Sequence, residues 1–168
     1  LEHAIFTIFV HFFKELYSSV VLPWIANGHF ILATENFLNG YNPGLTSHYS
    51  MNGMYLSVAV IYFFSLFFEE KKKKDGICLG ISVIALLLTA KRAHLLFSVL
   101  SCVAVYMISN KDRISKRIFN LILIIAIGII CIFILSMFVP QVLTVIERFE
   151  EGAESGNLLN GRENFYKL

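Results

Sequence analysis

Four long apolar runs dominate this chain, and short charged segments separate them. The runs cover residues 51–68, 76–90, 93–109 and 118–139, and none contains Asp, Glu, Lys or Arg. A helix needs roughly 20 apolar residues to cross the hydrocarbon layer of a bilayer, which is about 30 Å thick. The pattern predicts four membrane-spanning helices, and therefore an all-α, polytopic bundle.

The break between the second and third runs consists only of Lys91 and Arg92. A continuous helix over residues 76–109 would be about 51 Å long at 1.5 Å per residue. That length is too great for one crossing, and the charged pair would lie near its centre. We therefore predict a tight hairpin with Lys91 and Arg92 at its tip.

The distribution of charge predicts which side of the membrane each loop faces. Residues 69–75 and 110–117 hold eight of the 14 Lys and Arg residues but only four of the 12 Asp and Glu residues. Because cytoplasmic loops carry an excess of Lys and Arg, both loops are expected in the cytoplasm. Residues 1–50, the hairpin tip and residues 140–168 then face outward, the last as the start of a large outer loop.

The first 24 residues are less regular, because Lys14 and Glu15 interrupt their apolar stretch. They fit either the outer end of a span or an interfacial helix, with Tyr17 and Trp24 as anchors at the membrane surface. Turn-forming Asn-Gly and Asn-Pro-Gly segments follow, and they predict an irregular outer loop before residue 51.

The composition agrees with a membrane protein and excludes several other classes. Hydrophobic residues make up 57% of the chain and charged residues 15%, an excess typical of lipid-embedded proteins. The net charge of +2 gives no reason to expect a nucleic-acid partner. No phosphate loop, zinc-ligand spacing or nucleophile elbow is present, so neither a metal nor a cofactor is expected, and Cys78, Cys102 and Cys131 are interpreted as packing residues.

Three arginines remain on the predicted outer side: Arg92 at the hairpin tip, Arg148 after the last run, and Arg162 near the end of the chain. The planar guanidinium group donates two parallel hydrogen bonds and keeps its charge when partly desolvated. These arginines are therefore candidates for binding a lipid-linked diphosphate. The alternative is that each pairs with a neighbouring carboxylate.

Two histidines and a lysine on the same side are further candidates. His48 lies in a polar cluster before the first run, where imidazole could act as a base or bind sugar or phosphate. The alternative is a helix-capping region, in which such side chains satisfy free backbone N–H groups. Lys91 and His94 share the hairpin tip with Arg92 as accessory candidates, and His3, His11 and His29 are interpreted as interfacial or packing residues.

The order of these features resembles the superfamily of O-antigen ligases and O-antigen polymerases, which includes capsular polysaccharide repeat-unit polymerases. Three segments carry the resemblance: residues 44–53 (GLTSHYSMNG) before a span, residues 86–93 (LLLTAKRA) at the hairpin tip, and Arg148 followed by residues 160–166 (NGRENFY). Lys91 stands where the family usually has Ser.

The resemblance implies part of a GT-C-like glycosyltransferase in a bacterial plasma membrane. Its substrate would be an undecaprenyl-diphosphate-linked oligosaccharide, transferred at the outer face to a sugar acceptor without nucleotide or metal, and Arg92 and Arg162 match diphosphate-binding positions. The family's catalytic histidine would follow Leu168, so this segment alone is expected to be inactive. A transporter or flippase of an anionic lipid-linked substrate and a structural membrane subunit remain as alternatives.

Overall fold

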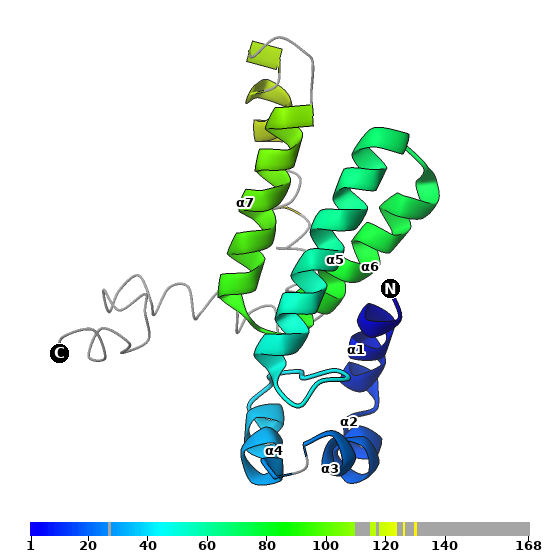
Figure 1. The fold of residues 1–168 in the computed structure, drawn as a ribbon, viewed down its shortest axis with the longest axis vertical. Coiled ribbons are helices and arrows are strands. Elements are labelled where there is room, and N and C mark those ends of the chain that lie inside the picture. The colour runs from blue at the N-terminus through cyan, green and yellow to red at the C-terminus, as the bar shows by residue number, and fades with distance from the viewer. Residues whose placement is uncertain (27, 110–114, 117, 124–125, 127–129, 131–168) are drawn as a thin grey trace, which may run out of the picture.

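The computed structural model of the chain describes residues 1–26, 28–109, 115–116, 118–123, 126 and 130 (Figure 1). Within these residues every regular element is a helix and no strand occurs. In chain order the elements are α1 (Glu2–Phe12), α2 (Lys14–Leu16), the π-helical turn η1 (Tyr17–Val21), α3 (Leu22–Ile25), α4 (Phe30–Leu38), α5 (Tyr49–Glu70), α6 (Lys73–Leu88) and α7 (Arg92–Ser109). The predicted all-α class is confirmed for this part of the chain.

The three long helices α5, α6 and α7 follow three of the predicted apolar runs. Helix α6 ends at Leu88, and α7 begins at Arg92 after a turn in which Ala90 has a φ of +54°. The continuous helix over residues 76–109 is therefore absent, as predicted. Helix α7 packs mainly against α5, with little contact to α6.

Among the residues that the structure describes, two helices are long and apolar enough to cross a membrane, namely α5 and α7, with mean hydropathies of 1.6 and 1.5. A third crossing is possible if Glu2–Phe12 and Lys14–Ile25 act together, although they meet at a bend of 106°. Such a pair is a broken span or a re-entrant loop. With 16 residues, α6 is shorter than α5 and α7. Of the predicted span 118–139, the described residues 118–123, 126 and 130 are helical.

The turn between α5 and α6 is shorter than the predicted loop of residues 69–75. It comprises only Lys71 and Lys72, and Lys71 adopts the left-handed conformation that ends α5, with its N–H donating to the Phe67 carbonyl oxygen at 2.9 Å. The side chains of Lys72 and Glu70 form an exposed ion pair. This turn lies at the same end of the helices as the end of α7 (Figure 1).

Two apolar clusters hold the helices together. The first joins α1, α5 and α6, and the second joins α1 to the short helices at its end. The members of the first are Ala4, Leu56, Val60, Ala85 and Leu86, and those of the second are Val10, Tyr17, Leu22, Ala26, Ala33 and Phe37. The short helices α3 and α4 lie at the end opposite to the α5–α6 turn (Figure 1).

The predicted role of Tyr17 as a surface anchor is wrong. Only 1% of this residue is exposed, its ring packs against Phe37, and its hydroxyl donates a hydrogen bond of 2.7 Å to the Gly44 carbonyl oxygen. A buried tyrosine with a satisfied hydroxyl is a core residue. Trp24, by contrast, is 88% exposed, as an interfacial anchor would be.

Candidate functional site

Buried polar side chains fix the loop that leads into α5. Asn52 of α5 donates from Nδ2 to Thr7 Oγ1 of α1 at 3.1 Å and to the Asn42 carbonyl oxygen at 3.0 Å. Asn42 in turn donates to the Thr7 carbonyl oxygen at 2.8 Å and accepts from the Gly44 N–H at 2.9 Å. Since buried polar groups are costly unless paired, this connected network holds the loop against both α1 and α5.

The hairpin tip meets the first turns of α5. The Lys91 ammonium lies 4.5 Å from the centre of the Tyr49 ring, a cation–π contact. One turn further along, the His94 ring packs over Gly53, so closely that a Cβ on Gly53 would lie 2.7 Å from His94 Cδ2. The two helices thus approach each other where α5 has no side chain.

His48 caps the N-terminus of α5. Its Nδ1 accepts a hydrogen bond of 3.2 Å from the Ser50 N–H, and its ring stacks on Tyr49 with centres 4.4 Å apart. A neutral imidazole whose Nδ1 accepts carries its proton on Nε2. In this geometry His48 is a capping residue with a second hydrogen bond to donate, which favours the capping interpretation over that of a base.

The surroundings of His48 favour its neutral form by lowering its pKa. Partial burial, and to a lesser degree the charge of Lys91, hold its pKa below the ordinary value of 6.5. In the unfolded chain, His48 therefore binds a proton more readily than it does in the folded protein. His48 is expected to reduce stability as the pH falls below about 6.5 and to have no such effect at higher pH.

Removal of the Lys91 charge is expected to raise the pKa of His48 toward 6.5, because one of its two causes disappears. We expect Lys91→Gln to move the His48 titration to higher pH in NMR spectra of the protein labelled on its histidine rings. Lys71→Gln, at the far turn, is the control and should leave it in place. An unchanged titration in Lys91→Gln would contradict the geometry of the hairpin tip.

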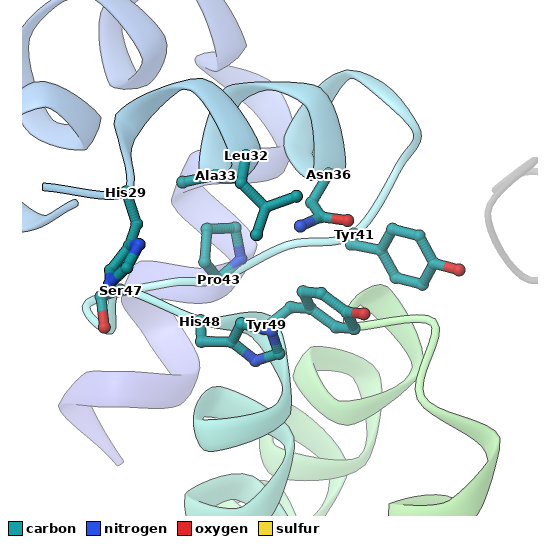
Figure 2. Close-up of a pocket in the computed structure, with 9 residues that line it drawn as sticks. All are labelled: His29, Leu32, Ala33, Asn36, Tyr41, Pro43, Ser47, His48 and Tyr49. Carbon is teal, nitrogen blue, oxygen red and sulfur yellow. The ribbon is translucent and has the colours of Figure 1, made fainter. Parts of the chain in front are cut away.

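A cavity of about 210 Å³ lies between α4 and the start of α5 (Figure 2). Its wall comes from α4, from the segment on either side of that helix, and from the start of α5. The lining residues are His29, Leu32, Ala33, Asn36, Tyr41, Pro43, Ser47, His48 and Tyr49. The rings of Tyr41 and Tyr49 stack with centres 4.4 Å apart.

The structure therefore brings together three of the residues that the sequence singled out. Lys91, His94 and His48 surround the start of α5, and Arg92, which is partly buried, follows Lys91 as the first residue of α7. Arg148 and Arg162 lie outside the described residues. Within the described residues, no three His, Cys, Asp or Glu side chains are arranged to hold a metal ion.

Several residues of this region were not predicted from the sequence to belong to the site. His29 was interpreted as an interfacial or packing residue; it is exposed, which does not fit packing, and it lines the cavity. Tyr41 and Tyr49 carried no signal beyond their proximity to turn residues, and Thr7 carried none, since its partner Asn52 is 45 residues away. The cysteines Cys78 and Cys102 are free and partly buried, and Cys131 lies outside the described residues.

Comparisons of this chain with protein-family models, with curated proteins and with solved structures return no match. The resemblance to O-antigen ligases and polymerases therefore rests on the three sequence segments alone.

Proposed function

We propose that this chain is part of a polytopic membrane glycosyltransferase that polymerises or ligates undecaprenyl-diphosphate-linked glycan at the outer face of the membrane. Arg92 binds the diphosphate, together with Arg148 and Arg162 on the outer loop, and Lys91 and His94 assist. The segments 69–75 and 110–117 face the cytoplasm of a bacterial cell.

The observation that carries the proposal is the gathering of polar and cationic residues at one end of the helices. Lys91, His94 and His48 come from two separate segments and meet beside Arg92. The α5–α6 turn and the end of α7 lie at the opposite end (Figure 1). This arrangement supports one membrane face that carries the lysine-rich segments and another that carries the substrate site.

The proposed chemistry uses the charges of this end directly. The acceptor sugar hydroxyl forms a new bond to the anomeric carbon of the lipid-linked glycan, and the bond from that carbon to the diphosphate oxygen breaks. Undecaprenyl diphosphate leaves with the electron pair, and a base takes the hydroxyl proton. Arg92 stabilises the negative charge that grows on the diphosphate, an effect that a partly desolvated site strengthens.

Arg92→Ala or Arg162→Ala in the full-length protein is expected to reduce long polymer by about 100-fold or more, because loss of one donor to a developing charge costs about 2.7–4 kcal/mol. The measurement is polymer length and amount in cells, with protein levels checked by immunoblotting. Lys73→Ala, at the opposite end of the helices, is the matched control and should leave polymer unchanged. Normal polymer in both arginine variants would refute the proposal.

A transporter or flippase is a second candidate, favoured by one observation. The 106° bend between Glu2–Phe12 and Lys14–Ile25 is a broken span or a re-entrant loop, and broken helices form substrate sites in many transporters. The Arg92→Ala cells distinguish the two. Lipid-linked single repeats should accumulate on the outer leaflet if the protein is a transferase, and on the inner leaflet if it is a flippase.

A further inference from the structure

We propose that the cavity between α4 and the start of α5 is a binding site for one sugar ring. The inference rests on the proposed function, since it assigns a part of the glycan to a defined place beside Lys91. The volume of the cavity, about 210 Å³, is below the roughly 300–1,000 Å³ of pockets for drug-sized ligands. A cavity of this size accommodates a single pyranose unit rather than an oligosaccharide.

The polar groups of the wall match a neutral, hydroxylated ligand. Asn36 supplies an amide and Ser47 a hydroxyl, so the wall contains both donors and acceptors. None of the nine lining residues is Asp, Glu, Lys or Arg. His48 adds an Nε2–H donor, because its Nδ1 accepts from the Ser50 N–H.

The apolar groups of the wall match the other property of a pyranose, its C–H-rich faces. Leu32, Ala33 and Pro43 line the cavity together with the edges and faces of the tyrosine rings (Figure 2). Small ligand sites commonly combine such apolar and aromatic walls with a few placed polar groups. The buried network that joins Asn42 to Thr7 and Asn52 keeps the loop side of the cavity fixed.

The position of Lys91 links the cavity to an anion. Tyr49 lines the cavity, and the Lys91 ammonium lies 4.5 Å from the centre of the same ring. A positive charge therefore stands beside a neutral sugar-sized cavity. This juxtaposition fits a sugar ring that is attached to a phosphate, with the ring in the cavity and the phosphate near Lys91.

The test uses the full-length protein in detergent micelles and the methyl glycosides of glucose, galactose and N-acetylglucosamine as probes. Saturation-transfer NMR is expected to show transfer to at least one glycoside. Leu32→Trp fills the cavity from α4 and should weaken binding at least about tenfold, equivalent to about 1.4 kcal/mol. Leu38→Trp makes the same change at an exposed position of α4 that does not line the cavity, and it should bind like the wild type.

A second variant protects the test against misfolding of Leu32→Trp. Asn36→Leu removes one polar group from the wall with little change in volume, and it should also weaken glycoside binding. No transfer to any glycoside in the wild type, or equal binding in Leu32→Trp and Leu38→Trp, would overturn the inference. If the glycosides do not bind but polymer still depends on Arg92, the proposed function stands without this sugar site. If the glycosides bind but Arg92→Ala makes normal polymer, the sugar site stands and the proposed function is refuted.

Discussion

Replacement of Gly44 by alanine is expected to lower the free energy of unfolding by about 3 kcal/mol. Gly44 has a φ of +57°, and a left-handed backbone costs other residues roughly 1–2 kcal/mol. The new Cβ would also lie 2.7 Å from Asn52 Nδ2 and 2.8 Å from Thr7 Oγ1. Both atoms belong to the buried network, and a buried polar group that loses its partner costs about 1–3 kcal/mol.

Gly40→Ala separates these two effects. Gly40 has a φ of +85°, but no atom lies within 4 Å of its Cβ position, so this variant should lose only the roughly 1–2 kcal/mol of backbone strain. Thermal unfolding of both variants in the same detergent gives the comparison, with the lower midpoint expected for Gly44→Ala. Equal midpoints would mean that the network contributes little to holding the loop.

The long helices were predictable because their signal is local. The apolar runs that correspond to α5, α6 and α7 each contain enough apolar residues in sequence to favour a helix in lipid. The breaks between the runs were placed less well: α5 continues through Glu69 to Glu70, and α6 already begins at Lys73. Charged residues at the membrane surface extend a helix as readily as they end it, because the backbone hydrogen bonds continue outside the apolar stretch.

The first 48 residues were less predictable, since their structure depends on distant contacts. The hydroxyl of Tyr17 bonds to Gly44, 27 residues away, and Thr7 bonds to Asn52, 45 residues away. In the sequence, a tyrosine beside Lys14 and Glu15 is typical of a membrane surface. Only the folded loop supplies the carbonyl oxygen that allows its hydroxyl to be buried.

The candidate site was predictable in part. The charge distribution predicts that Lys91, His94 and His48 lie on one side of the membrane, and the structure brings them to one end of the helices. The contacts of Lys91 with Tyr49 and of His94 with Gly53 could not be deduced from the sequence. Tyr49 lies in a polar segment and Gly53 in an apolar run, and neither has a feature that indicates its partner. Gly53 is important because the absence of a side chain there leaves space for the His94 ring.

Gly53→Ala is expected to lower the free energy of unfolding by about 1–2 kcal/mol and to displace the His94 ring. Its Cβ would lie 2.7 Å from His94 Cδ2 and 3.3 Å from His94 Cγ, and overpacking of this kind costs about 1–3 kcal/mol. The better helix propensity of alanine offsets less than about 1 kcal/mol of this. Unfolding in detergent measures the first effect, and the ring NMR signals of His94 measure the second.

Gly80→Ala is the matched control, because Gly80 lies within α6 and has no atom within 4 Å of its Cβ position. That substitution is expected to stabilise the protein by about 0.5–1 kcal/mol. The two alanine variants differ only in whether another helix occupies the space beside the glycine. If Gly53→Ala were as stable as Gly80→Ala and kept the His94 signals in place, α7 would not approach α5 at Gly53 as the structure shows.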